Sequence, residues 1–294
     1  EDDGTYTMFY GATDNDGSIG IAGSLDGISW TNRTQLLKPS DLGTNITWLS
    51  TPFHFQDLDS KRYLYFAYYD GKWKIGRIML GAYDIIVPDQ YPTIQQAINA
   101  ANPGDSIYVR NGTYYENVVV NKTVTLTGES KYTTIIDGGG IGSAVRITVD
   151  NVSISGFTVR ASYPWYYAGI DLANANNCKI TNNIAINSWE GIRLSWSSSN
   201  TISGNTITNN TNMGVGLYSS SGNNVSGNNI TNTGMESFFS CGVYLSGSSG
   251  NIVSGNTIVN NLCFGIGDEA YGPSNTIISG NTITNNSGGG LYLY

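Results

Sequence analysis

The sequence has little charge, few cysteines and no long hydrophobic run. Only 12% of its 294 residues are charged, with 22 Asp and Glu against 14 Lys and Arg, which gives a net charge of −8. This balance argues against a nucleic-acid partner, because phosphate backbones are bound by clusters of Lys and Arg. No run of about 18 apolar residues is present, so we expect no membrane span. Three Cys and one His predict neither a disulfide framework nor a metal site, and no cofactor motif is found.

Glycine, tyrosine and small polar residues are plentiful instead. The chain has 37 Gly and 20 Tyr, and Asn, Ser and Thr are concentrated in its second half. This composition is typical of a protein rich in β-strands and turns, and a hydrophobic fraction of 39% is enough to form a core. Many Asn-x-Ser/Thr sequences favour an extracellular or cell-surface location. The candidate glycosylation sites are Asn32, Asn45, Asn111, Asn121 and Asn229.

Residues 1–84 alternate apolar and polar side chains with a period of two, as in residues 6–10 and 63–66. Asp-Gly pairs punctuate these runs, and the combination predicts antiparallel β-hairpins. The phrases at residues 3–10 and 19–30 resemble blades of the five-bladed propeller glycosidases. The segment is too short for the four or more blades of a propeller, so the resemblance covers a fragment. No catalytic residue of that family can be matched to it.

One convincing helix is predicted, over residues 93–101. Ile94, Ala97, Ile98 and Ala101 follow the spacing of one helical face. Thr93 and the Gln three residues later form a capping box, and an Asn-Pro-Gly sequence ends the helix. A short helix with one apolar stripe is not stable alone, so we expect it to cover the end of a larger core.

The C-terminal part contains an internal repeat. The phrase Ile-Ser-Gly-Asn-Thr-Ile occurs at residues 202–207 and 278–283, and variants of it start at residues 154, 180, 225 and 253. A second phrase, Gly-apolar-x-Leu, accompanies it, with copies that start at residues 169, 191, 214, 242, 265 and 290. Two strand-like phrases that recur together every 22–28 residues indicate a solenoid, in which each repeat stacks on the one before.

Repeats of this length with short strands predict a parallel β-helix. Ile202 and Ile207, at the two ends of the phrase, are expected to point inward. The Asn within the phrase is expected to stack from coil to coil, because Asn tolerates left-handed backbone and its amide satisfies turn groups. The predicted ladder comprises Asn183, Asn205, Asn228, Asn256 and Asn281.

The segment before the repeats carries a family resemblance. It spans residues 87–118 and contains the phrases Tyr91-Pro-Thr-Ile-Gln and Gly112-Thr-Tyr-x-Glu-x-Val. It resembles the N-terminal part of right-handed parallel β-helix proteins of the pectin-lyase-like class. That class includes pectin lyases, pectin esterases, and carbohydrate-binding and sugar-hydrolase repeat proteins. The resemblance covers residues 85–294, which is most of the chain.

The predicted fold class is therefore all-β. Residues 85–294 are expected to form a right-handed parallel β-helix, a solenoid whose start is capped by the helix over residues 93–101. Residues 1–84 are expected to form a small antiparallel segment similar to propeller blades. Because the class holds lyases, hydrolases, esterases and proteins without activity, the resemblance predicts the fold but not the reaction.

Candidate catalytic residues lie on one outward column, where equivalent positions of adjacent coils meet. The Gly-apolar-x-Leu phrase places Asp171 and Arg193 one coil apart, and Glu190 directly precedes the second copy. An acid–base pair or an Arg-assisted lyase could be built from these three residues. A lone Asp–Arg pair on adjacent coils is, however, more often a surface salt bridge than a catalytic pair.

Aromatic residues gather in the loops that lead into the same strands. An aromatic face beside a carboxylate and an arginine is what a sugar-binding groove needs, since rings stack on aromatic faces and hydroxyls need fixed partners. The predicted carbohydrate-binding residues are Trp165, Tyr166, Tyr167, Trp189, Arg193 and Tyr244.

Three classes of function fit these features: a structural β-helix protein of the cell surface, a polysaccharide-binding module, and a polysaccharide lyase or glycoside hydrolase. No Asp-Asp cluster occupies one outward column, and open ends with a charge-poor, repetitive body favour the structural protein, with glycan contact as an accessory role. The chain begins at Glu1 and stops inside a repeat phrase, which suggests further copies of itself or a longer parent chain as partners. The predicted assembly residues are Leu291, Tyr292, Leu293 and Tyr294.

Overall fold

The computed structural model of the chain comprises two compact units, Glu1–Tyr83 and Asp84–Tyr294, which we describe separately. It describes residues 6–11, 19–24, 31–37, 48–56, 62–69, 72–81, 83–161, 166–234, 240–268 and 275–293.

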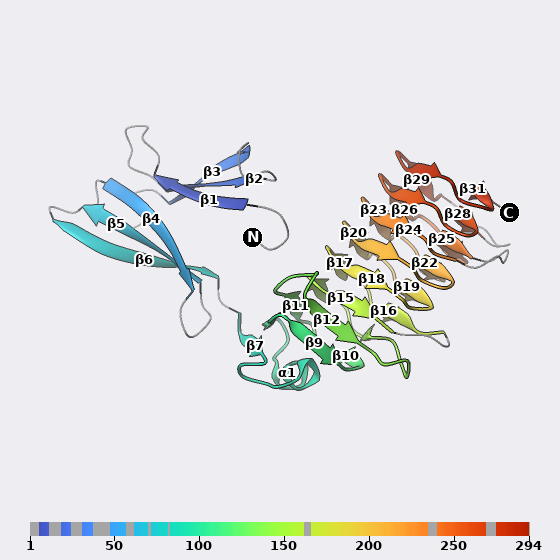
Figure 1. Ribbon diagram of the computed structural model, residues 1–294, viewed down its shortest axis with the longest axis horizontal. Coiled ribbons are helices and arrows are strands. Elements are labelled where there is room, and N and C mark those ends of the chain that lie inside the picture. Colours follow the sequence, from blue (N-terminus) through green and yellow to red (C-terminus); the bar gives the residue numbers. More distant parts are fainter. Residues whose placement is uncertain are drawn as a thin grey trace. The chain divides into compact units, whose positions relative to one another are not determined.

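The first unit contains two antiparallel three-stranded sheets (Figure 1). One sheet has the order β1 (Tyr6–Gly11), β2 (Ile19–Ser24) and β3 (Thr31–Leu37). The other has the order β4 (Trp48–Gln56), β5 (Arg62–Tyr69) and β6 (Trp73–Gly81). Sequential antiparallel pairing confirms the predicted hairpins, whereas the relation to propeller blades stays a prediction. The Asp-Gly pairs fall outside the described residues.

The second unit is a parallel β-solenoid with three sheets, which we call sheets 1 to 3. Sheet 1 contains β7 (Ile85–Val87), β8 (Ser106–Val109), β11 (Thr125–Gly128), β14 (Ser153–Ser155), β17 (Lys179–Thr181), β20 (Thr201–Ser203), β23 (Asn224–Ser226), β26 (Ile252–Ser254) and β29 (Ile277–Ser279). Sheet 2 contains β9 (Gly112–Tyr115), β12 (Thr134–Asp137), β15 (Thr158–Arg160), β18 (Ile184–Ile186), β21 (Thr206–Thr208), β24 (Asn229–Thr231), β27 (Thr257–Val259) and β30 (Thr282–Thr284). Sheet 3 contains β10 (Val118–Val120), β13 (Val145–Ile147), β16 (Ala168–Ala173), β19 (Glu190–Ser195), β22 (Met213–Tyr218), β25 (Cys241–Ser246), β28 (Phe264–Asp268) and β31 (Gly289–Tyr292).

Equivalent strands of successive coils stack in register, as Figure 1 shows for β17, β20, β23 and β26. Ile180 aligns with Ile202, and Ile202 aligns with Val225. All three side chains are fully buried, so the apolar positions of the repeat form continuous inward columns. The prediction that Ile202 and Ile207 point inward is confirmed, and the fold is the predicted all-β solenoid.

The predicted capping helix is α1 (Ile94–Ala100), the single helix among the described residues. Thr93 is its N-cap, and the Thr93 hydroxyl accepts a hydrogen bond from the Gln96 N–H at 3.1 Å. The Glu116 carboxylate, from the first coil, accepts bonds from two further N–H groups of the first turn, both at 3.0 Å. The buried face of α1 packs into the core of the solenoid, as expected for a cap.

The predicted asparagine ladder lies where each coil turns from sheet 1 into sheet 2. Asn205 Nδ2 donates to Asn228 Oδ1 at 3.0 Å, and Asn228 Nδ2 donates to Asn256 Oδ1 at 3.0 Å. The buried amides therefore satisfy one another from coil to coil. Two further ladders, which were not predicted, lie at the turn from sheet 3 to sheet 1. One comprises Asn200, Asn223 and Asn251, and the other comprises Ser197, Ser220 and Ser248.

The glycine of the Gly-apolar-x-Leu phrase is required by close packing at the start of the sheet 3 strands. A Cβ atom on Gly191 would lie 2.7 Å from the carbonyl oxygen of Gly214 and would clash with the Ile207 side chain. Gly214 and Gly242 stand in the same position one and two coils further on, against the next backbone and an inward Ile. The repeat thus keeps glycine here because no side chain fits between the coils.

Candidate functional site

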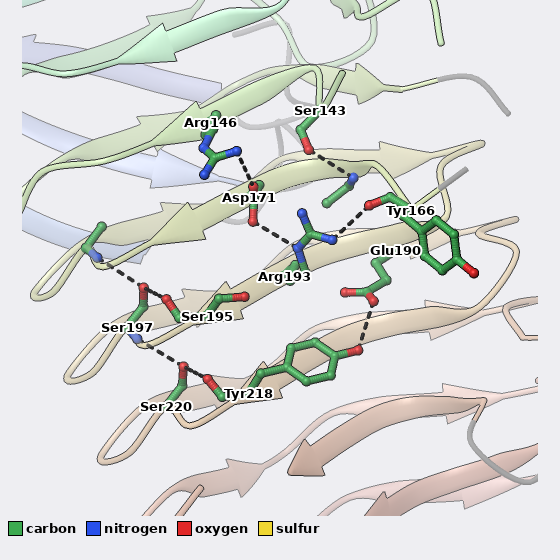
Figure 2. Close-up of polar contacts among 12 residues, drawn as sticks. Ser143, Arg146, Tyr166, Asp171, Glu190, Arg193, Ser195, Ser197, Tyr218 and Ser220 are labelled. Carbon is green, nitrogen blue, oxygen red and sulfur yellow. Dashed lines mark hydrogen bonds and ion pairs between the residues drawn. The ribbon is translucent and has the colours of Figure 1, made fainter. Parts of the chain in front are cut away.

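The outward face of sheet 3 carries the charged residues that the repeat spacing singled out (Figure 2). In the register Arg146 aligns with Asp171, Asp171 with Arg193, and Arg193 with Gly216. Asp171 and Arg193 therefore lie on adjacent coils, as their spacing predicted. Glu190 opens β19, and its side chain reaches toward the next coil on the same face.

Asp171 is a buried anion held between two arginines. Arg193 Nε donates to Asp171 Oδ1 at 3.0 Å, and Arg146 Nη1 lies 3.9 Å from Asp171 Oδ2. The Asp171 side chain is only 4% exposed, so its two oxygens face guanidinium groups rather than solvent. Arg146 was not predicted, although extending the outward column by one coil would have found it. The carboxylate of Asp171 is thus engaged by both arginines.

Glu190 differs from Asp171 because its charge is not neutralised by a direct ion pair within the described residues. The Tyr218 hydroxyl donates to Glu190 Oε1 at 2.8 Å, while Glu190 Oε2 is buried with no hydrogen-bond partner among the described residues. Burial raises the pKa of Glu190 to about 7, outweighing the opposing effects of the Arg193 charge and the Tyr218 hydrogen bond. The carboxyl is therefore mostly protonated below pH 7. Leaving an oxygen of a neutral carboxyl without a hydrogen-bond partner costs much less than leaving an oxygen of a buried carboxylate anion without one.

Tyr218 and Gly216 complete the surroundings of this carboxyl, and sequence reasoning missed both roles. A Cβ atom on Gly216 would lie 3.0 Å from Glu190 Oε2 and 2.8 Å from the Tyr218 ring, so these two side chains occupy the space beside the glycine. The Tyr218 hydroxyl also lies 3.1 Å from Met213 Sδ. Burial, followed by the charge of Glu190, raises the pKa of Tyr218, which keeps its phenol protonated.

An exposed aromatic pair lies next to this cluster. The rings of Tyr166 and Trp189 have centroids 5.1 Å apart and are tilted by 54°, and Tyr166 is 63% exposed. Trp189 and Tyr167 are half-buried, and Trp165 lies outside the described residues. We call Tyr166 and Trp189 the aromatic platform.

Tyr244 lies on the next coil beyond Gly216, beside Tyr218, and is only 5% exposed. It packs with Met213 and Cys241 in a small cluster against Tyr218 and Phe264. A ring buried to this degree leaves little surface for a sugar, so we do not include Tyr244 in the candidate site.

The remaining predicted residues are the assembly and sequon residues, of which Leu291 and Tyr292 lie on β31, the last strand of sheet 3. At the last coil Leu291 and Leu293 are 50% and 59% exposed, and Tyr292 packs on Phe264 with centroids 4.8 Å apart. Tyr294 and Asn45 lie outside the described residues, and the side chain of Asn32 is not described. The other sequon residues are exposed, namely Asn111, Asn121 and Asn229.

Within the described part of the chain, no three His, Cys, Asp or Glu side chains gather closely enough to hold a metal ion. Within the same residues, no helix has the length and apolar character needed to cross a membrane.

The parallel coils, the asparagine ladders and the outward site on sheet 3 define a β-helix protein. The family model described as right handed beta helix region matches residues 82–234 and 140–294, which covers most of the chain. The protein therefore belongs to this family, and its solenoid is right-handed. No curated protein matches the sequence.

The solved structures similar to this chain include an alginate epimerase, an alginate lyase and a pectin methylesterase solved with an oligosaccharide. A double mutant of the periplasmic alginate epimerase AlgG has 17% identity and a TM-score of 0.51, over 69% of this chain and 50% of its own. An alginate lyase from Paenibacillus sp. str. FPU-7 has 15% identity and a TM-score of 0.46, over 68% of this chain and 94% of its own. A pectin methylesterase in complex with a hexasaccharide has 11% identity and a TM-score of 0.47, over 61% of this chain and 80% of its own. At 17% identity the similarity to AlgG shows the fold alone.

Proposed function

We propose that this protein binds a polysaccharide on the outward face of sheet 3, with the aromatic platform as the contact surface. The observation that carries the proposal is the exposed Tyr166 ring beside Trp189, because sugar rings stack on aromatic faces that protrude from a rigid scaffold. The fold is shared with the alginate epimerase AlgG, which supports a glycan as the kind of ligand.

The charges around the platform also suit a sugar ligand. Arg146 is 54% exposed and touches Asp171 only at 3.9 Å, so its guanidinium can donate to a sugar hydroxyl or carboxylate. With Glu190 protonated, the two arginines exceed the one ionised carboxylate of Asp171, which makes this face locally positive in a chain of net charge −8.

Replacing Trp189 with Ala is expected to weaken glycan binding by about tenfold, because it removes half of the stacking surface. The control is Trp196→Ala, since Trp196 is a tryptophan with 68% exposure that is not part of the platform. Binding is measured by calorimetry with alginate, pectin and neutral glucans. Absence of binding by the unmodified chain to the whole panel, or equal losses in both variants, would contradict the proposal.

A second candidate function is cleavage of the bound polysaccharide. The specific observation is the buried, mostly protonated Glu190 with Tyr218, a combination suited to proton transfer. Because Asp171 is committed to two arginines, a hydrolase with two free carboxylates is not supported, and a lyase fits better. Product release from the same panel that disappears with Glu190→Gln would favour the enzyme over the binding protein.

We further propose that the protein is extracellular or at the cell surface and assembles through the coil that carries β31. Exposed Leu291, Leu293 and Ile277 support assembly, because exposed apolar side chains favour contact with another chain. Small-angle scattering over a range of concentrations is expected to show particles larger than one chain. Replacing Leu291 and Leu293 with Lys should shift the particles to single chains, and a monomer at all concentrations would contradict assembly.

A further inference from the structure

We propose that Arg193 is a positioning residue that fixes the aromatic platform rather than a sugar ligand, and that the protonation of Glu190 controls how firmly it does so. The role of the platform in glycan binding rests on the proposed function. The geometry of the platform, however, can be followed without any glycan, so the two ideas can be tested separately.

The guanidinium of Arg193 is engaged by protein groups on two sides. Its Nε donates to Asp171 Oδ1 at 3.0 Å, and its Nη1 donates to the main-chain carbonyl oxygen of Tyr166 at 2.8 Å. The side chain is 23% exposed, and Asp171, which orients it, is almost fully buried. Arg193 therefore ties the turn before β16 to the strand of the next coil, as Figure 2 shows.

The turn that Arg193 holds has a backbone conformation that a tyrosine rarely adopts. Tyr166 has a φ of 58°, in the left-handed region, which is unfavourable for a bulky side chain unless its surroundings hold it in place. A charged donor to the Tyr166 carbonyl is a strong restraint of this kind. The main-chain N–H of Trp189 donates to the main-chain carbonyl of Tyr167 at 3.0 Å, which connects the backbone of the other platform residue to the same turn. Releasing the Arg193 bond should therefore let Tyr166 relax away from Trp189.

Glu190 is the group that can compete for Arg193. It is 4% exposed, Oε2 has no hydrogen-bond partner among the described residues, and the charge of Arg193 acts on it. The other titratable groups that face it are Asp171 on β16 and Tyr218 on β22, with Tyr244 of β25 beside Tyr218. Neither Asp171 nor a protonated phenol supplies a cation, so an ionised Glu190 would draw on Arg193.

The direction of the pH effect follows from this arrangement. Burial raises the pKa of Glu190 to about 7, so below pH 7 the carboxyl is mostly neutral and leaves Arg193 to Asp171 and Tyr166. As pH rises through 7 the carboxyl ionises, attracts Arg193, and weakens the bond to the Tyr166 carbonyl. The platform should therefore be ordered at pH 6 and loosened at pH 8.

The test uses the fluorescence of Trp189 in the full chain without glycan, taken as the difference between each protein and its Trp189→Phe counterpart. Arg193→Gln is expected to shift the Trp189 emission at pH 6, because Tyr166 moves off the indole. The matched control is Arg160→Gln, which removes a comparable Arg–Asp pair, with Asp137 at 2.7 Å, from sheet 2. The control should leave the Trp189 emission unchanged.

Glu190→Gln supplies a second readout that does not depend on the folding of the Arg193 variant. The unmodified chain should change its Trp189 emission between pH 6 and pH 8, whereas Glu190→Gln should keep the pH 6 emission throughout. Arg193→Gln should also lower the affinity for any glycan that binds by about tenfold, as Trp189→Ala does.

Two results would overturn the inference. One is a folded Arg193→Gln variant whose Trp189 emission at pH 6 equals that of the unmodified chain. The other is a Glu190→Gln variant whose Trp189 emission responds to pH in the same way as the unmodified chain. If Arg193→Gln lost affinity while its ligand-free emission stayed the same, Arg193 would be a sugar ligand. If no glycan bound but both emission changes occurred, the positioning role would stand and the proposed function would fail.

Discussion

Replacing Ile207 with Asp is expected to lower the free energy of unfolding by several kcal/mol. Ile207 is fully buried in the inward column of sheet 2, where it aligns with Ala185 and Ile230. A carboxylate at this position would be removed from water without a nearby cation or hydrogen-bond donor. Burying an unpaired charge is among the most destabilising core substitutions. Urea unfolding followed by circular dichroism measures the loss.

The matched control is the preceding residue, Thr206, which lies on β21 and points to the other face of the strand. Thr206→Asp introduces the same charge in a half-buried outward position, where water can solvate it, so the expected loss is below about 1 kcal/mol. Equal destabilisation by the two variants would mean that the register of this strand is wrong.

Replacing Asn228 with Ala is expected to cost about 3 kcal/mol or more, because it interrupts the asparagine ladder in its middle. The Asn228 side chain accepts bonds from the N–H and the amide of Asn205, both at 3.0 Å, and donates to the Ile202 carbonyl at 2.9 Å. Without it these buried groups lose their partner, and each buried group left unsatisfied costs about 1–3 kcal/mol. The midpoint of urea unfolding measures the change.

The neighbouring Asn229 provides the control for this experiment. It belongs to the next strand, β24, and its side chain is exposed, so Asn229→Ala should change stability by no more than about 0.5 kcal/mol. A small effect of Asn228→Ala, similar to that of Asn229→Ala, would show that the ladder contributes little to folding.

Much of the fold could be predicted from the sequence, because a solenoid repeats its interior at a constant spacing. Each coil must fill the same inward positions. Ile202 therefore recurs as Ile or Val in the other copies, and Ile207 recurs as Ile or Val in all of them except the copy with Ala185, so the columns are visible directly. The capping helix was equally predictable, since the Thr93 cap and the apolar stripe are local features. The ladder that contains Asn200 was not predicted, because the sequence around Asn200 varies more between copies than Ile-Ser-Gly-Asn-Thr-Ile does.

The candidate site was decided largely by the tertiary structure. The spacing placed Asp171 beside Arg193, and extended by one coil it also reaches Arg146, but it could not say that Tyr218 would contact Glu190 across a coil. Outward side chains are not constrained by the repeat, so their contacts depend on length, rotamer and the space that neighbouring coils leave. Tyr244 is buried and Tyr166 is exposed because different neighbours pack around each ring. This packing, and not the position of each residue in the repeat, determines which of the two rings a ligand can reach.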